Sequence, residues 1–270
     1  MSRQIIGYQC IRNRRTGEIV GLLTPIYADE WTYSVPPDSQ AAWRYMDIWK
    51  FEWILAHAAL YFRRCDKFED PLEGRLSPKE VHGTSESEKA FRAAYPIKSD
   101  YESAAAAQEI TRGCIFVNCW NMRNEEDARM WNGYTGGSDS LAIQSTVGQL
   151  RRAISDDITM SAVRYVPLST PRIKFSELTV FFYKDVAFEY ENELRLVRPL
   201  GDGEEVYSDK EEDFGKEIPF RPDLAICRVI MNKRISDEAA NTVRSLCRDY
   251  CPGAAVELSR LEMSGSSVLR

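Results

Sequence analysis

Alternating and clustered apolar positions divide most of the chain into short predicted strands and helices. The predicted strands cover residues 42–46, 60–63, 114–120, 141–145, 160–167, 194–197, 224–231 and 256–261. Helices are predicted within an excursion over 77–108, from Asn124 to about Tyr134, at 149–154 and at 237–250. Residues 177–185 have mixed character, and residues 201–217 have the composition of a charged loop.

The segment that follows the first of these strands has the clearest helical pattern. Its apolar stripe consists of Ile48, Phe51, Ile54, Leu55 and Ala58. This spacing places them on one face of a helix of about three turns, which begins at Ile48 and presents that face to a core. Asp47 is well suited to be its N-cap. The local order is therefore strand, helix, strand.

The first 40 residues are expected to form an accessory element. Residues 4–11 and 18–23 have strand-like alternation on either side of a polar turn over 13–17, which predicts a hairpin. Pro36-Pro37 then breaks regular pairing. We expect an accessory hairpin and linker over residues 1–40, a single α+β domain over 41–263, and a tail over 264–270.

Composition narrows the class of protein. The 270 residues are 44% hydrophobic and 28% charged, within the range of a globular protein, and the formal charge of −6 argues against a molecule that binds nucleic acid over its whole surface. The seven cysteines form an odd set without zinc spacing, and the start of the chain has no secretory pattern. We therefore expect free thiols, no metal site and a cytoplasmic protein, and we find no apolar run long enough for a membrane span.

Common catalytic motifs are absent, and four polar clusters remain as candidates for chemistry. The sequence has no phosphate-binding loop, no dinucleotide-binding glycine motif, no nucleophile elbow and no zinc-protease motif. The clusters are Trp43-Arg44-Tyr45-Met46-Asp47, Asp70-Pro71-x-Glu73-Gly74, Met130-Trp131-x-x-Tyr134 and Tyr190-Glu191-x-Glu193-Leu194-Arg195. Each is weak alone, but together and in this order they resemble a bacterial domain-of-unknown-function family, over about residues 43–231.

That family is distantly similar to ADP-ribosyltransferases. The resemblance implies an α+β fold with a mixed, partly split β-sheet and flanking helices, and it implies NAD as substrate with no metal. The implied catalytic residues are Glu193 and its neighbour Glu191. The implied NAD-binding residues are Arg44, Tyr45, Tyr61, Trp131 and Tyr134.

The chemistry requires such residue types. A cation holds the phosphates or ribose, aromatic side chains pack against the nicotinamide, and a carboxylate stabilises positive charge at the anomeric carbon. Glu191 and Glu193 are two residues apart, so we expect them to share one face of a strand.

Each candidate also has a structural interpretation. Arg44 can cap or pair with a surface acid, the aromatic residues can belong to the core, and Glu73 can pair with Arg63 or Arg64. Ion pairs with Lys184 or Arg195 would account for Glu191 and Glu193 without catalysis. We expect the side chain of His57 to be packed against its neighbours or to have the end of its ring exposed to solvent.

The favoured function is transfer of ADP-ribose from NAD to a macromolecule, protein or nucleic acid, in a toxin or phage-defence context. One alternative is a non-enzymatic nucleotide-sensing or protein-interaction module that uses the same cleft. A second alternative is a metal-dependent nuclease, for which Asp66, Asp70 and Glu73 are the only compact carboxylate set in the sequence. We further expect Arg44 and Glu193 to face one pocket, with Tyr61 or Trp131 on its wall.

Overall fold

The computed structural model describes residues 5–9, 24–27, 33–70, 72–75, 104–167, 178–201 and 213–261. Within them, the strands are β1 (Ile5–Gln9), β2 (Thr24–Tyr27), β3 (Ala41–Asp47), β4 (Ala59–Arg64), β5 (Ile115–Asn121), β6 (Ser140–Thr146), β7 (Thr159–Ala162), β8 (Arg164–Val166), β9 (Tyr183–Asp185), β10 (Glu193–Pro199), β11 (Gly215–Pro219), β12 (Arg228–Met231) and β13 (Ala255–Leu258). The α-helices are α1 (Ile48–His57), α4 (Ala104–Gly113), α5 (Ala128–Tyr134), α6 (Val147–Ala153), α7 (Pro222–Ala225) and α8 (Asp237–Tyr250). Short 3-10 helices are η1 (Cys65–Lys67), η2 (Thr179–Phe182) and η3 (Val186–Glu191).

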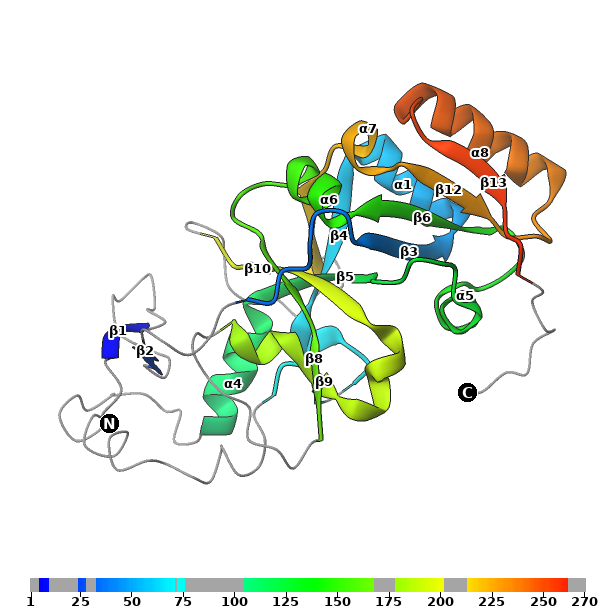
Figure 1. The fold of residues 1–270 in the computed structure, drawn as a ribbon. Helices are drawn as coiled ribbons and strands as arrows, with labels where there is room; N and C mark the ends of the chain where they lie inside the picture. The colour runs from blue at the N-terminus through cyan, green and yellow to red at the C-terminus, as the bar shows by residue number, and fades with distance from the viewer. Residues whose placement is uncertain are drawn as a thin grey trace.

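A mixed sheet of nine strands forms the centre of the protein (Figure 1). Its main path runs β11-β4-β5-β3-β6-β12-β13, and β10 joins β5 to β7 off this path. The pairs within it are antiparallel except for β12 with β13. The expected α+β class with a mixed sheet and flanking helices is thus confirmed.

The sheet is split beside β5. On one edge of β5, strand β10 pairs along the whole length from Ile115 to Asn121. On the other edge, β4 pairs with β5 only at Phe116 and Val117, and β3 pairs with β5 only at Asn121. Strands β3 and β4 therefore diverge, and the stretch of β5 between their contacts pairs with neither of them. This opening is where the cavity described below lies.

Helix α1 connects the two diverging strands. Its Phe51, Ile54 and Leu55 are buried in the main core, as the apolar stripe predicted. Ala58 is exposed instead, because it ends the helix in the left-handed conformation with φ of 45°. Asp47 has the extended backbone of an N-cap, but its Oδ1 accepts a hydrogen bond from Gly136 N at 2.6 Å rather than from the helix. The side chain expected to cap α1 thus anchors the end of α5.

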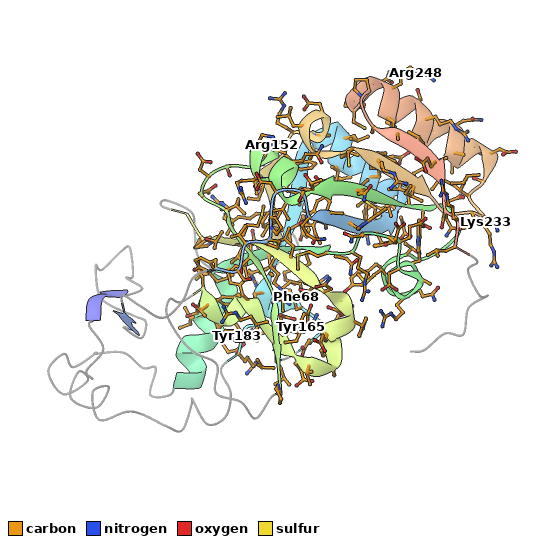
Figure 2. All side chains as sticks on the ribbon, in the orientation of Figure 1. Phe68, Arg152, Tyr165, Tyr183, Lys233 and Arg248 are labelled. Atoms are coloured by element: carbon orange, nitrogen blue, oxygen red, sulfur yellow. The ribbon has the colours of Figure 1, made fainter. Side chains whose placement is uncertain are left out.

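Three apolar clusters support the two faces of the sheet. The main one lies among the sheet, α1, α6 and α8, and a second packs α5 against β3 and β6. The third lies under η1 and η2. Figure 2 labels Tyr165 of β8 and Tyr183 of β9, which lie far from Arg248 of α8.

Several element boundaries differ from the sequence prediction. Helix α5 begins at Ala128 rather than after Asn124, because Asp127 is its N-cap and accepts a hydrogen bond from Arg129 N. The predicted strand over 160–167 is two strands, β7 and β8, separated at Val163, whose N–H bonds to Glu193 O.

Two further corrections concern the C-terminal part. Residues 215–217, predicted as loop, belong to β11, which pairs with β4. Residues 224–225, predicted as strand, end helix α7, for which Pro222 provides a favourable first residue.

Some predictions fall partly outside the described residues. β1 does pair with a later strand, but this is β2 at Thr24–Tyr27, whereas the predicted partner residues 18–23 are not described. The tail 264–270 and most of the excursion over 77–108 are not described either. Six cysteines are described and all are free, and Cys10 lies outside the described residues. None of the described helices is long and apolar enough to cross a bilayer.

Candidate active site

A cavity of about 1050 Å³ opens where the sheet splits. Its walls come from β3, α1, β4, the middle of β5, the end of α5 and the region from Lys184 to Arg195. Its size is at the upper end of the range usual for small-molecule sites. Segments that are far apart in the sequence therefore surround one cavity.

Aromatic side chains dominate the walls of the cavity. They are Trp43, Tyr45, Trp49, Trp53, Tyr61, Phe68, Trp120, Tyr134 and Phe188. Trp49, Tyr61 and Tyr134 are between 40% and 59% exposed, so their rings are available to a ligand. Flat apolar surfaces of this kind suit the packing of planar rings.

Arg44 brings a cation into this cavity with no protein partner. Its Nη1 is buried and makes no hydrogen bond with the described part of the chain. Burial lowers the pKa of Arg44 to about 10, which still leaves the guanidinium charged at neutral pH. An unpaired buried cation is costly, so the expected surface pairing of Arg44 does not explain its presence, whereas an anionic ligand would.

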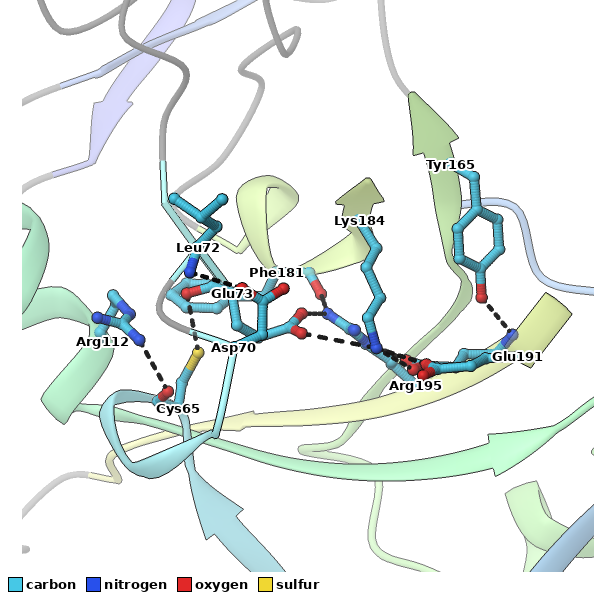
Figure 3. Close-up of polar contacts among 11 residues, drawn as sticks. Cys65, Asp70, Leu72, Glu73, Arg112, Tyr165, Phe181, Lys184, Glu191 and Arg195 are labelled. Carbon is cyan, nitrogen blue, oxygen red and sulfur yellow. Dashed lines mark hydrogen bonds and ion pairs between the residues drawn. The ribbon is translucent and has the colours of Figure 1, made fainter. Parts of the chain in front are cut away.

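A buried ion network also borders the cavity, and Figure 3 shows its contacts. Lys184 Nζ contacts the carboxylates of Glu191 and Glu193, the latter at 2.9 Å, and lies 3.8 Å from Glu73. Arg195 donates to Glu193 Oε2 at 2.6 Å and also pairs with Glu73. All five side chains are at most 9% exposed. Three carboxylates thus face two cations, which leaves the fully ionised network with one excess negative charge.

The two central carboxyl groups have opposite pKa shifts. Burial, together with the hydrogen bond and charge of Glu193, raises the pKa of Glu191 to about 8, against the effect of Lys184. Burial would also raise the pKa of Glu193, but the charge of Arg195, the hydrogen bond with Glu191 and the charge of Lys184 hold it well below its ordinary value. Glu193 is therefore the ionised member of the pair, and Glu191 is the member that takes up a proton.

Glu191 and Glu193 do not share a strand face, contrary to the expectation. Glu191 ends η3 and Glu193 begins β10, with Asn192 between them at φ of 43°. The left-handed residue turns the chain so that both carboxylates still meet at Lys184. The predicted pairing with Lys184 and Arg195 is observed, while the predicted pairing of Glu73 with Arg63 or Arg64 is wrong: Arg64 pairs with Asp66.

The predicted aromatic residues divide into two groups. Tyr45, Tyr61 and Tyr134 line the cavity. Tyr45 is 5% exposed, and its hydroxyl accepts a hydrogen bond from Asp127 N at 3.0 Å. Trp131 does not line the cavity. It is buried, meets Tyr45 edge to face at 5.2 Å between ring centroids, and donates a hydrogen bond to Glu126.

His57 is exposed at the end of α1, with its Nδ1 2.9 Å from Trp53 O.

Arg44 and Glu193 line the same cavity but belong to different faces of the sheet. Arg44 is opposite Ile143 in the register of β3 with β6, and Ile143 lies in the main core on the side of α1. Glu193 is opposite Asn121 in the register of β10 with β5, and Asn121 is opposite Trp43 in the register of β5 with β3. These three side chains therefore lie on the other face of the sheet. Both side chains border the cavity at the opening that the split leaves between β3 and β4.

The three carboxylates considered for a nuclease do not form a metal site. Asp66 pairs with Arg64, Asp70 accepts from Leu72 N, and Glu73 belongs to the ion network. In the described ranges, no three histidine, cysteine or acidic side chains are placed to hold a metal ion. Each carboxylate has a different structural partner.

Sequence reasoning missed Asn121 and underestimated Lys184 and Glu73. Asn121 Oδ1 is buried in the site without a partner, although Asn121 looks like an ordinary strand end in the sequence. Lys184 and Glu73 lie in segments without strong periodicity, so only their contacts connect them to Glu193. The one signal in the sequence for this network was the presence of the D-P-x-E-G and Y-E-x-E-L-R clusters, whose Glu73 and Arg195 pair in the structure.

Comparisons with known proteins give limited similarity. No family model matches the chain, and no curated protein matches it. Among solved structures, it is similar to Thermus sp. 2.9 DarT in complex with ADP-ribosylated ssDNA, with 11% identity and a TM-score of 0.37 over 85% of this chain and 98% of the other. The same protein in complex with NAD+ has 11% identity and a TM-score of 0.36 over 85% and 98%, and with carba-NAD+ 11% identity and a TM-score of 0.33 over 83% and 97%. Scores this low do not establish a common fold.

Proposed function

We propose that this protein is an NAD-dependent ADP-ribosyltransferase that transfers ADP-ribose to a macromolecule. The observation that carries this proposal is that one cavity is lined by Arg44, whose buried Nη1 has no partner in the described part of the chain, by exposed aromatic rings and by the buried carboxylate of Glu193. These are the three kinds of group that the bond cleavage in NAD requires. The ADP-ribosyltransferase-like fold itself is part of the proposal, and the split sheet supports it.

In the reaction, the bond between the ribose anomeric carbon and the nicotinamide nitrogen breaks, and nicotinamide leaves with the electron pair. Positive charge develops on the sugar, and an acceptor nucleophile attacks it and loses a proton. Glu193 suits this transition state because it remains ionised beside Lys184 and Arg195. Glu191 is its neighbour and can hold a proton at neutral pH.

The remaining residues would bind and position the dinucleotide. Arg44 would hold the phosphates, and Tyr61 and Tyr134 would pack against its rings. Tyr45 would line the cavity between Tyr61 and Tyr134, and Trp131 packs against Tyr45 from the core. The acceptor would be a protein or nucleic acid, and a toxin or phage-defence role in the bacterial cytoplasm is the setting that the motif resemblance favours.

The test is release of nicotinamide from NAD+ by the parent protein and by Glu193→Gln. The substitution keeps the size of the side chain and leaves the network with two carboxylates and two cations, so we expect it to fold. We expect turnover to fall by about 10²–10³-fold while NAD+ affinity changes little, the scale for loss of one preorganised electrostatic group.

Asp66→Asn is the matched control. It removes a carboxylate from a pair with buried Arg64, outside the residues that line the cavity. We expect it to lower the melting temperature without a specific loss of turnover. A folded Glu193→Gln protein that binds NAD+ and releases nicotinamide at the parent rate would contradict the proposal.

A second function, nucleotide sensing without catalysis, is favoured by one observation. Both carboxylate oxygens of Glu193 already contact Lys184 or Arg195, as a purely structural residue would. The same experiment separates the two functions, because a sensor would bind NAD+ or a related nucleotide and release no nicotinamide.

A further inference from the structure

Asn121 presents a buried acceptor that no group in the described part of the chain pairs with. Its side chain is 1% exposed and lines the cavity. The Nδ2 group donates to Glu191 O at 2.5 Å, while Oδ1 has no hydrogen-bond partner. A buried acceptor without a donor costs free energy, so a native protein that retains one usually has a use for it.

The orientation of the Asn121 amide is fixed by its neighbour. If the amide were rotated by 180°, Oδ1 would face the carbonyl oxygen of Glu191, and two acceptors would be in contact. The contact with Glu191 therefore requires the NH₂ group on that side. It leaves Oδ1 as the acceptor that lacks a donor in the described part of the chain.

Asn118, on the same strand, shows the ordinary outcome. Its Nδ2 donates to Tyr61 O at 2.9 Å, and its Oδ1 accepts from Trp120 Nε1 at 2.9 Å. This amide also lines the cavity, yet its hydrogen bonds are complete within the protein. The unpaired acceptor is thus particular to Asn121 rather than common to the asparagines of β5.

The position of Asn121 indicates which donor it would meet. It lies directly opposite Glu193 on β10 and directly opposite Trp43 on β3, so all three side chains share one face of the sheet. A ligand group that reaches Asn121 would therefore lie close to Glu193 and to the sugar that this carboxylate faces in the proposed reaction. In NAD, nicotinamide is attached to that sugar, and its carboxamide carries an NH₂ donor.

We propose that Asn121 Oδ1 accepts a hydrogen bond from the carboxamide NH₂ of nicotinamide and thereby selects the amide form of the dinucleotide. This inference rests on the proposed function. The acid form, nicotinic acid adenine dinucleotide, has a carboxylate in place of the amide, with no donor and a negative charge. It would leave Oδ1 unpaired and would be repelled by the neighbouring carboxylates, so the site would reject it.

The experiment compares binding of NAD+ and nicotinic acid adenine dinucleotide by calorimetry, with nicotinamide release measured in parallel. For the parent protein we expect NAD+ to bind at least about tenfold more tightly, in keeping with an acceptor left unpaired. For Asn121→Leu, which has similar volume and no acceptor, we expect this ratio to fall clearly below the parent value, while repulsion by the neighbouring carboxylates keeps it above one. The ratio of the two affinities is informative because a general loss of stability weakens the binding of both ligands together.

Asn118→Leu is the control, because it removes two internal hydrogen bonds from the same strand and should lower stability while the ratio is kept. If Asn121→Leu does not fold, the smaller Asn121→Ala takes its place. Equal binding of the two dinucleotides by the parent, or a ratio unchanged in the folded Asn121 variant, would overturn the role of Asn121. In that case, nicotinamide release would still support the proposed function, whereas absence of NAD+ binding by the parent would end both proposals.

Discussion

The guanidinium of Arg44 has no partner in the described part of the chain, so its removal should affect ligand binding more than folding. We expect Arg44→Ala to weaken NAD+ binding by about tenfold to a hundredfold, because a charge-assisted hydrogen bond contributes about 1.5–3 kcal/mol. Turnover at saturating NAD+ should change much less. Calorimetric titration and steady-state nicotinamide release measure the two effects.

Thermal unfolding distinguishes this role from a structural one. Removal of an unpaired buried charge should leave the melting temperature of Arg44→Ala unchanged or higher. Arg221→Ala is a control for loss of an arginine, since Arg221 is exposed at the start of α7 and its side chain pairs, within the described residues, with Asp223 of the same helix. A large fall in melting temperature with unchanged affinity would show that Arg44 is structural.

Glu191 should make the stability of the protein depend on pH. Its pKa is about 8 in the folded protein, because of burial and the nearby Glu193, and about 4.3 in an unfolded chain. The folded protein therefore holds a proton that the unfolded chain has released. The stabilisation is complete below the unfolded pKa and is lost as the pH rises through about 8.

We accordingly expect the melting temperature to fall between pH 6 and pH 9. Glu191→Gln, which resembles the protonated carboxyl group, should show a clearly smaller fall over the same range. Differential scanning calorimetry at matched ionic strength provides the measurement. Parallel pH profiles for the two proteins would mean that Glu191 is ionised throughout this range.

At the scale of elements, the D-P-x-E-G turn depends on its glycine. Gly74 has φ of +66°, and a Cβ there would lie 2.5 Å from the Phe181 ring and 2.8 Å from Cys65 Sγ. We expect Gly74→Ala to destabilise the protein by at least about 1–3 kcal/mol, from backbone strain and this close contact. Urea unfolding measures the change.

Glu73 precedes this glycine and pairs with Arg195, so the same variant should also disturb the active-site network. Gly253→Ala is the matched control, because a Cβ at that position meets no atom within 4 Å. We expect its unfolding free energy to stay within about 0.5 kcal/mol of the parent value, as for other surface substitutions. Equal effects of the two substitutions would contradict the role given to Gly74.

Element types were predictable where periodicity and caps agreed. The stripe of α1 identified its buried Phe51, Ile54 and Leu55, and the helix predicted over 237–250 is α8. Boundaries were less accurate where more than one polar residue could begin a helix, as at Asn124 and Asp127. Strand β11 escaped prediction because its residues are mostly polar and its order comes from pairing with β4.

At the scale of the whole molecule, the free cysteines provide a simple test. Six cysteines are described without a disulfide, and Cys10 lies outside the described residues. We expect seven thiols to react under denaturing conditions without reductant, as for a protein of a reducing compartment. A shortfall that reductant restores would contradict the expected cytoplasmic location.

The sequence by itself determined the class of fold, most of the element order and the residue types of the site. Hydrophobic periodicity is a local property, so it can be recognised along the chain, and the four polar clusters marked Arg44, Glu191 and Glu193 in advance. The same local reasoning placed Glu191 and Glu193 on one strand, because it could not detect the left-handed Asn192 between them.

Only the tertiary structure decided how these residues meet. The split between β3 and β4 depends on which partners β5 takes along each edge, and these contacts join residues up to about eighty positions apart. The same pairing places Asn121 between Trp43 and Glu193, while the fold around it closes the ion network of Lys184 and leaves Asn121 Oδ1 without a donor. Burial and pairing of charge depend on such long-range contacts, and for this reason the partners of each polar group could not be inferred from its neighbours in the chain.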